Sequence, residues 1–234
     1  MFKRKTKQPV NILADMEPLY HNYSFFGVNN SQLPGAYALN QKAKSPIITA
    51  YIAHALAKSK KKASDSVSFS ELFCADGYYA MVAARLGCHS SVGIDNNRDK
   101  HFGSASQIAD RLGLGHVRFI QQEIEPASAF EPTDIVANVG GLYHVPCPEE
   151  ILEMSYGMAE KYLIVQNVVS LATDDENYYE SPAPGWTWGN RFSRTSFDKV
   201  VRKYCPNIID HHFNVLEGNG RQEDRGSVYY LIQK

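Results

Sequence analysis

From residue 67 onward, short apolar runs of strand length alternate with segments whose apolar residues have helical spacing. Residues 67–74 alternate and end in a turn, and residues 78–86 place Met81, Val82 and Leu86 on one helical face. Strands that alternate with helices in this way form a mostly parallel sheet with helices on both faces, so the pattern predicts an α/β domain. Further strands are expected at 91–94, 116–121, 134–139 and 162–167, and further helices at 98–112 and 149–161.

The C-terminal part of the chain departs from this alternation. Residues 195–204 have helical spacing, but the strand-like segments 208–214 and 228–232 follow each other without a helix between them. Consecutive strands with a short connection pair antiparallel, so we expect a terminal antiparallel hairpin.

The segment before residue 67 has a different character. Pro34-Gly35 interrupts it, Ser45-Pro46 is a start signal for a helix over 47–58, and a polar Lys/Ser stretch follows. These features predict an N-terminal helical cap with its linker over residues 1–66 and a main domain over residues 67–234.

The composition fits one such domain. The 234 residues are 44% hydrophobic, enough for one large core, and no apolar stretch approaches the roughly 20 residues that span a bilayer. The basic start, Met1 to Lys5, leads into no apolar region and is not typical of a secretory signal. We therefore expect a cytoplasmic protein with no membrane association.

Basic residues gather in two tufts although the formal net charge is only -1. Such tufts can hold RNA or another polyanion, but charge runs of this size are usually solvated surface, and we favour that interpretation. Nucleic acid is therefore an alternative partner, less favoured than a small molecule, and the oligomeric state is left open. The tufts consist of Lys3, Arg4, Lys5 and Lys7 and of Lys58, Lys60, Lys61 and Lys62.

Ligands of doubly wound sheets bind beyond the carboxyl ends of the strands, which here is the turn Phe73–Gly77 after the first strand. Small residues let a ligand approach the backbone, and N–H groups at the start of the next helix favour an anion. Asp95 ends the second strand 18 residues after Gly77, where a carboxylate can accept both hydroxyls of a ribose. The chain has neither GxxxxGK[ST] nor GxGxxG, so triphosphate and nicotinamide dinucleotide binding are disfavoured.

Three segments together resemble the class I S-adenosylmethionine (SAM)-dependent methyltransferases. They are ELFCADGYYA at 71–80, VGID at 92–95 and GGLYH at 140–144, and they are most similar to the branch with a GCxDGYY motif that includes enzymes alkylating hydroxylated wobble uridine in tRNA. The resemblance implies a Rossmann-like, seven-stranded, mostly parallel sheet with an antiparallel C-terminal hairpin, with SAM as cofactor and methyl transfer as activity. Phe73 and Ala75 stand where that branch usually has glycines, whereas Gly77 is kept.

The resemblance also implies the cofactor contacts by position. Glu71 would order the methionine amino group, and Asp95 would hold the ribose. Phe73–Gly77 would line the methionine part, Glu123 and Ile124 would border the adenine, and Asn138–Gly140 would close the pocket beneath the sulfonium. The complete predicted set is Glu71, Phe73, Cys74, Ala75, Gly77, Tyr78, Asp95, Asn96, Glu123, Ile124, Asn138, Val139 and Gly140.

Two residues on the loop after the fourth strand are candidates for catalysis. Methyl transfer from a sulfonium is an in-line displacement at an activated carbon, so the protein mainly aligns the reactants and excludes water. His144 would face the methyl group, and with an ordinary pKa near ~6.5 it can accept a proton from a hydroxyl acceptor. The competing interpretation is a structural histidine that binds loop backbone. Tyr143 is predicted to orient the acceptor or to shield the sulfonium by cation–π contact.

The segment 181–191 is the candidate for acceptor binding, because it carries Trp186, Trp188 and Arg191 between prolines and glycines. Two tryptophans are unusual for a solvent-facing loop, so we expect a lid over an acceptor with a ring and an anionic group. The alternative is a loop that folds its tryptophans onto the core. No metal is expected, because the fourth strand ends in Asn138 and not in an acid.

Three functions are therefore open from the sequence. The leading one is SAM-dependent methylation of oxygen or nitrogen on a small molecule. The alternatives are a tRNA nucleoside-modifying SAM enzyme and a non-catalytic SAM-binding regulatory protein, which the replacement of two motif glycines by Phe73 and Ala75 keeps open.

Overall fold

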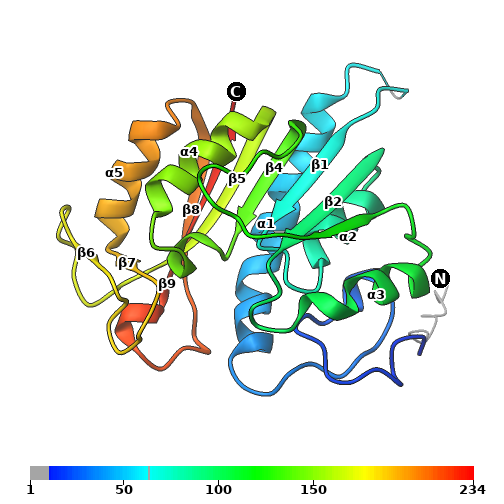
Figure 1. Ribbon diagram of the computed structural model, residues 1–234, viewed down its shortest axis with the longest axis horizontal. Coiled ribbons are helices and arrows are strands. Elements are labelled where there is room, and N and C mark those ends of the chain that lie inside the picture. The colour runs from blue at the N-terminus through cyan, green and yellow to red at the C-terminus, as the bar shows by residue number, and fades with distance from the viewer. Residues whose placement is uncertain (1–10, 63) are drawn as a thin grey trace, which may run out of the picture.

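The computed structural model describes residues 11–62 and 64–234, and a twisted sheet runs through its centre (Figure 1). The sheet has seven strands in the order β3-β2-β1-β4-β5-β9-β8, in which β9 is antiparallel to both of its neighbours and the other pairs are parallel. The predicted mostly parallel sheet with its antiparallel C-terminal hairpin is confirmed. Its strands are β1 (Ser68–Leu72), β2 (Ser90–Asp95), β3 (Arg118–Gln121), β4 (Thr133–Val139), β5 (Ala159–Val169), β8 (Ile208–Val215) and β9 (Gly226–Gln233).

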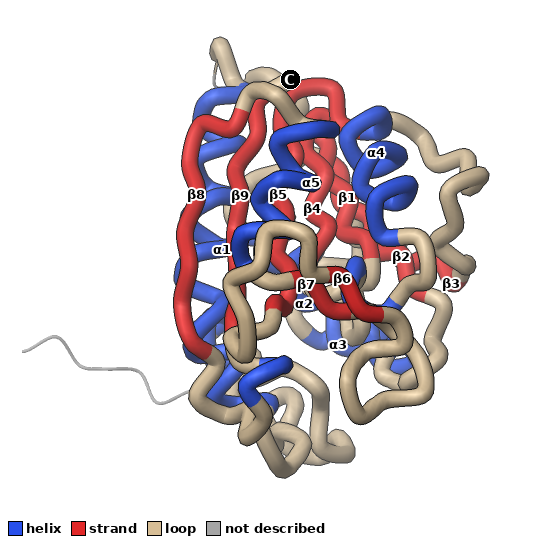
Figure 2. The backbone as a smooth tube through the Cα atoms, turned by 90° about the vertical axis from the view of Figure 1, so that its left-hand side faces the viewer, coloured by secondary structure: helices blue, strands red, loops and turns tan. Residues whose placement is uncertain are grey.

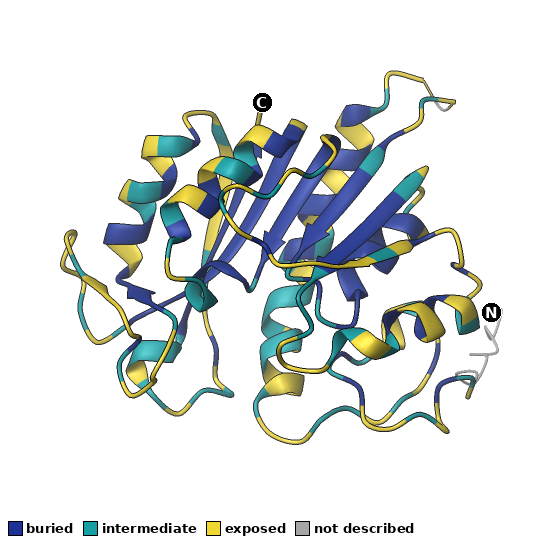
Figure 3. Ribbon diagram, viewed as in Figure 1, coloured by how far each residue is buried: buried dark blue, intermediate teal, exposed yellow. Residues whose placement is uncertain are grey.

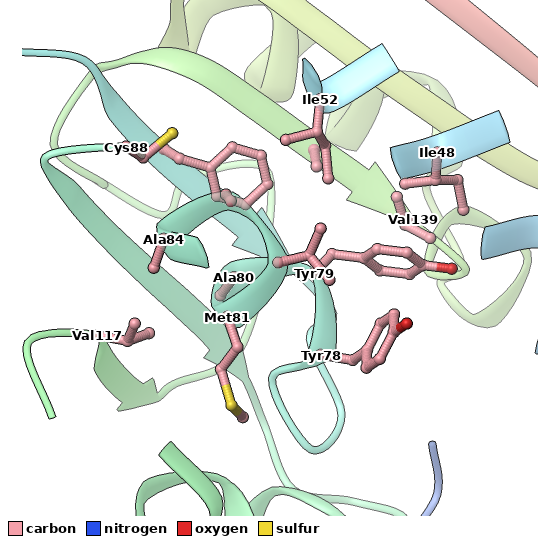
Figure 4. Packing of buried hydrophobic residues seen from close by; sticks show 14 of the residues in the cluster. Ile48, Ile52, Tyr78, Tyr79, Ala80, Met81, Ala84, Cys88, Val117 and Val139 are labelled. Carbon is pink, nitrogen blue, oxygen red and sulfur yellow. The ribbon is translucent and has the colours of Figure 1, made fainter. Parts of the chain in front are cut away.

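Helices cover both faces of the sheet, which explains why β4 is buried along its whole length (Figures 2 and 3). One hydrophobic cluster joins the sheet to α1, α2 and α3, and a second joins its other face to α4 and α5. Figure 4 shows the first cluster, where Ile48 and Ile52 of α1 meet Tyr79 of α2. The helices are α1 (Tyr37–Ser59), α2 (Tyr78–Arg85), α3 (Ala105–Arg111), α4 (Pro148–Met158) and α5 (Arg194–Tyr204).

Helix α1 begins ten residues earlier than predicted, and Pro46 lies inside it. Proline removes a backbone donor and normally ends a helix. Here Ile48, Ile52 and Leu56 bury one face of α1 against β4, β5 and β9, and this burial stabilises the helix despite the lost hydrogen bond.

Two further expectations need correction, and one hairpin was not predicted. The predicted helix 98–112 is a 3-10 turn, Phe102–Ser104, followed by the shorter α3. The predicted helix 149–161 ends at Met158, because Ala159 already pairs with Thr133 in the sheet. The short hairpin of β6 (Tyr179–Glu180) and β7 (Arg191–Phe192), which frames the loop between them, was not predicted.

The leader before α1 runs along the carboxyl ends of the parallel strands (Figure 1). It buries Leu13, Leu19 and Tyr23 in the cluster of α1 and α2. The first basic tuft, Lys3 to Lys7, lies outside the described residues, and the second begins with Lys58 in the last turn of α1 and continues just beyond the helix. Within residues 11–62 and 64–234, no helix is long and apolar enough to cross a membrane.

Candidate functional site

A cavity of about 790 Å³ lies at the carboxyl ends of the parallel strands, between the leader, α1 and the loop that follows β5. A second cavity of about 490 Å³ adjoins it on the side of Glu123 and Ile124. Ligands of doubly wound folds bind at this end of the sheet. The residues that line both cavities are Phe73, Asn96, Arg98, His144 and Val145.

The turn after β1 keeps the backbone geometry that glycines would allow. Phe73 (φ 60°), Ala75 (φ 48°) and Gly77 (φ 80°) are all in the left-handed region, which side chains of the first two types rarely adopt. Strained backbone of this kind persists where the surrounding structure holds it, most often at functional sites. The ring of Phe73 covers Gly141, because a Cβ atom built on Gly141 would overlap that ring.

Asp95 lies at the end of β2 beside this turn. Its Oδ2 accepts a hydrogen bond from the N–H of Ala75 at 3.0 Å, and its Oδ1 accepts one from the N–H of Asn97 at 2.6 Å. A carboxylate oxygen has a second lone pair, so both oxygens can still accept a ribose hydroxyl. Burial raises the pKa of Asp95 above its usual value. Beyond it, the side-chain amide of Asn96 donates to Glu123 Oε2 at 3.0 Å and fixes the edge of the smaller cavity.

Glu71 on β1 is 2% exposed, and its Oε2 accepts the N–H of Ala80 at 2.7 Å. The carboxyl group therefore caps the first turn of α2. Burial raises its pKa well above the usual value. Glu71 also lines the larger cavity, so capping does not remove it from the site.

Most of the predicted cofactor residues line one of the two cavities, but Gly77, Tyr78 and Asn138 line neither. Gly77 precedes α2 and lies against the ring of Phe119. The ring of Tyr78 stacks on His21 in the core, and the next residue, Tyr79, lines the larger cavity instead. The amide of Asn138 donates to Ser155 Oγ at 2.9 Å, beneath α4. The residues that line the cavities are Glu71, Phe73, Cys74, Ala75, Asp95, Asn96, Val139 and Gly140 in the larger and Glu123 and Ile124 in the smaller.

The leader is bound to the turn after β1 through Asp76, a contact that the sequence did not reveal. Asp76 is fully buried, with its Oδ1 2.5 Å from His21 Nδ1 and its Oδ2 accepting the N–H of His21 at 2.9 Å. The hydroxyl of Tyr23 donates to the carbonyl of Asp76 at 3.1 Å. These contacts bring Tyr20 and His21 into the lining of the larger cavity.

Tyr143, His144 and the two tryptophans form one aromatic wall of the cavity. The ring of His144 stacks on Trp188 with centroids 4.9 Å apart and lies 4.0 Å from the ring of Tyr143. Trp186 and Trp188 are 45% and 37% exposed, so they do not fold onto the core. The guanidinium of Arg98 lies 4.4 Å from the centroid of Trp188 and connects this wall to the loop after β2.

The expectation of an ordinary pKa for His144 was wrong. Burial, together with the positive charges of Arg98, Arg191 and Lys44, lowers the pKa of His144 to about 3. Its Nδ1 is buried and, among the residues that the structure describes, has no hydrogen-bond partner. The imidazole is therefore neutral at physiological pH and a weak base.

Arg191 lines the cavity, but its guanidinium is not free for a substrate anion. Nε and Nη2 donate to Asp224 Oδ1 at 2.9 and 2.6 Å, and Nη1 donates to the carbonyl of Asn190 at 2.6 Å. Arg191 thus joins the lid loop to the segment before β9. It also lies 5.2 Å from the ring centroid of Tyr143, whose pKa burial raises to about 12. The phenol of Tyr143 therefore stays protonated and can donate a hydrogen bond.

Compared by sequence, the chain matches no protein-family model and no curated protein. Compared by structure, it is similar to the N-terminal domain of EvdMO1 with SAH bound, at 14% identity and a TM-score of 0.65 over 93% of this chain and 92% of that one. It is also similar to magnesium protoporphyrin IX methyltransferase (ChlM) from Synechocystis PCC 6803 with bound SAH, at 12% identity and a TM-score of 0.60 over 87% and 90%. A third is coclaurine N-methyltransferase bound to N-methylheliamine and SAH, at 12% identity and a TM-score of 0.57 over 79% and 73%.

The chain has the class I methyltransferase fold. At these identities the likeness establishes the fold and not the reaction, since one fold serves many functions. The narrower resemblance to enzymes that alkylate wobble uridine stays a prediction. Among the described residues, no group of three or more His, Cys, Asp or Glu is arranged to hold a metal ion.

Proposed function

We propose that the protein is a SAM-dependent methyltransferase that transfers a methyl group to oxygen or nitrogen of a small molecule. The position of Asp95 carries this proposal, because it lines the larger cavity beside the turn after β1 and is followed by Asn96, which lines both cavities. Adenine would enter the smaller cavity beside Glu123 and Ile124, the ribose hydroxyls would bind Asp95, and the methionine part would follow the turn at Ala75 toward Glu71. The aromatic wall then faces the remaining space, where an acceptor would lie.

Asp95, Glu71 and the turn at Ala75 would hold SAM, which would supply an activated methyl group on a cationic sulfur and would leave as S-adenosylhomocysteine when a lone pair of the acceptor attacks the methyl carbon. The residues of the chain would hold the two reactants in line and exclude water. Because the pKa of His144 is about 3, we do not assign the acceptor's proton to it. The acceptor atom would react as an ionised hydroxyl or an unprotonated amine.

A small acceptor is favoured over tRNA by the position of the second lysine tuft. Lys44 of α1 lines the cavity, whereas Lys60 follows the other end of this helix, roughly 24 Å away at 1.5 Å per residue. Lys60 Nζ also donates to the carbonyl of Gly87 at 2.9 Å. Phe73 and Ala75 retain the left-handed backbone of a glycine turn, so the replacement of the two glycines is no argument against SAM binding.

The cofactor assignment is tested by Asp95→Ala, which should weaken SAM binding by about 1.5 to 3 kcal/mol, the usual contribution of charge-assisted hydrogen bonds. Isothermal titration calorimetry measures the change. Asp110→Ala is the matched control, since Asp110 is an exposed carboxylate of α3 that lines neither cavity, and it should bind SAM almost normally. Unchanged SAM affinity in Asp95→Ala would refute the ribose assignment, and NADH should not bind either protein.

The electrostatic state of His144 can be measured without knowing the acceptor. In an NMR titration, the His144 ring resonance, assigned with His144→Phe, should not shift between pH 5 and 8, because its pKa is about 3. Stability has a corresponding sign: below pH ~6.5 the unfolded chain takes up a proton that the folded chain does not, so His144 lowers the free energy of unfolding as the pH falls toward 3. A midpoint near pH 6.5 in the NMR titration of the His144 ring would restore this residue as a candidate base.

A further inference from the structure

The face of α1 that packs on the sheet is apolar over the sheet and polar where it borders the larger cavity. Ile48, Ile52 and Leu56 on this face are buried. Lys44 precedes Ile48 by four residues and therefore lies on the same face, one turn closer to the N-terminus. There it lines the larger cavity. Lys44 thus lies on the face of α1 that packs on the sheet, at the point where this face borders the cavity.

The face of β5 that packs on α1 also changes from apolar to polar residues where it reaches the cavity. Tyr162 and Ile164 pack into the cluster of α1, and Gln166 is the next residue on that face. Gln166 is fully buried and lines the larger cavity, and its Nε2 donates to Ser227 Oγ at 3.0 Å. Its Oε1 has no partner among the described residues. A buried polar atom without a partner is costly unless a ligand supplies one.

Lys44 differs from the arginines around the cavity because it lacks a counter-ion. The guanidinium groups pair with Asp224, with Glu223 and with Asp99. Within residues 11–62 and 64–234, no carboxylate lies within 4.0 Å of Lys44 Nζ. Burial lowers the pKa of Lys44 to about 8, so the ammonium form still predominates at pH 7. A partly buried cation without a counter-ion destabilises the fold, and a ligand anion would remove that cost.

We infer that Lys44 binds a carboxylate of the methyl acceptor and that Gln166 accepts a hydrogen bond from an N–H or O–H group of the same molecule. The inference rests on the proposed function and moves the anion site from Arg191, which is engaged with Asp224, to α1. It deepens that proposal by naming the acceptor class: small aromatic carboxylic acids with a hydroxyl or amino group.

Two observations favour a carboxylate of the acceptor over other anions. Lys44 lines the same cavity as His144 and Trp188 of the aromatic wall, so its ammonium is available to a ligand that packs on this wall. Lys44 supplies one positive charge, which balances a carboxylate but only part of the charge of a phosphate group, and the free oxygen of Gln166 in the same cavity can accept a hydrogen bond but adds no positive charge. The flat faces of Trp186 and Trp188 then suit a ring.

The chain offers its own probe, because its two tryptophans, Trp186 and Trp188, both line this cavity. Protein saturated with SAH is titrated at pH 7 with 3-hydroxybenzoate and with the neutral 3-hydroxybenzamide, and tryptophan fluorescence reports binding. We expect the carboxylate to bind about 10- to 100-fold more tightly, as for other charge-assisted hydrogen bonds. Lys44→Met should abolish this preference and Lys44→Arg should retain most of it. Lys42→Met, two residues away on the exposed face of α1, should leave it unchanged.

The same experiment separates the two proposals. If calorimetry shows no SAH binding to the wild-type protein, the proposed function fails before the acceptor is tested. If SAH binds, the inference is overturned by equal affinity for the two benzoic acid derivatives, by the absence of binding of both at millimolar concentration, or by a preference that survives in Lys44→Met. A loss of SAH affinity in Lys44→Met with no change in the preference would assign Lys44 to the methionine carboxylate and would also overturn it.

Discussion

His21→Ala should lower the free energy of unfolding by about 3 to 5 kcal/mol, the cost of leaving one member of a buried pair without its partner. Asp76 is fully buried, and its Oδ1 would lose the imidazole that lies 2.5 Å away. The stack of His21 on Tyr78 would be lost as well. Because Asp76 belongs to the turn after β1, SAM affinity should fall together with stability. Urea denaturation and calorimetry measure the two effects.

The pair is tested as a unit by a double-mutant cycle with Asp76→Asn. An asparagine can accept the N–H of His21 and carries no charge, so His21→Ala should cost about 1 to 2 kcal/mol less in the Asp76→Asn background. His101→Ala is the matched control: His101 also lines the cavity and packs on Tyr20, but no carboxylate of the described residues lies within 4.0 Å of its ring nitrogens, and its loss should cost about 1 kcal/mol or less. Additive effects of His21→Ala and Asp76→Asn would show that the two side chains do not stabilise each other.

The sheet could be predicted because each of its central strands has its own apolar signal. β4 and β5 are mostly apolar, with uninterrupted apolar runs at 135–137 and 162–165, as expected of strands covered on both faces. The bounds of α1 could not be predicted, since a local rule places a helix start at Pro46, whereas the decisive interaction is the burial of Ile48 and Ile52 on strands far along the chain. Tertiary packing outweighed local propensity there.

In the candidate site too, positions fixed by topology could be predicted, whereas contacts between residues far apart in the sequence could not. Asp95 was predicted to lie at the ligand-binding end of the sheet because topology fixes where β2 ends. Tyr78 was predicted where Tyr79 lies, because adjacent residues of a helix point about 100° apart and the motif does not reveal which one faces the cavity. His21 and Asp76 are 55 residues apart, and Arg191 and Asp224 are 33 apart, so no local pattern could indicate either pair.

The pKa of His144 shows why chemical roles are harder to predict than positions. Its loop and its place beside the cavity could be predicted from GGLYH, and both agree with the structure. The basicity of the ring depends on burial and on three cations, Arg98 after β2, Arg191 on β7 and Lys44 on α1, which only the fold brings together. A histidine at the expected position is therefore not a base with the expected strength.

Gly141→Ala should abolish measurable SAM binding and destabilise the protein by about 2 to 3 kcal/mol, the upper range for an overpacked site. A Cβ atom on Gly141 would overlap the ring of Phe73 at its first ring atom, so rotation of the ring alone cannot relieve the clash. The Phe73 side chain would have to leave its position, and the nearest free space is the pair of cavities that it lines. The displaced ring would then occupy the volume that the cofactor requires. Calorimetry with SAM and urea denaturation measure the two losses.

Phe73→Gly should restore both properties in the Gly141→Ala background, because it removes the ring and relieves the left-handed backbone of residue 73 (φ 60°). Gly157→Ala is the matched control: apart from its neighbours along α4, no atom of the described residues lies within 4 Å of its added Cβ, and it should be neutral or slightly stabilising within α4. If Gly141→Ala binds SAM with wild-type affinity, the Phe73 ring does not border the cofactor. If the double mutant fails to recover, Gly141 is required for the conformation of its own loop, and the presence of phenylalanine at a position that usually holds glycine has a different cause.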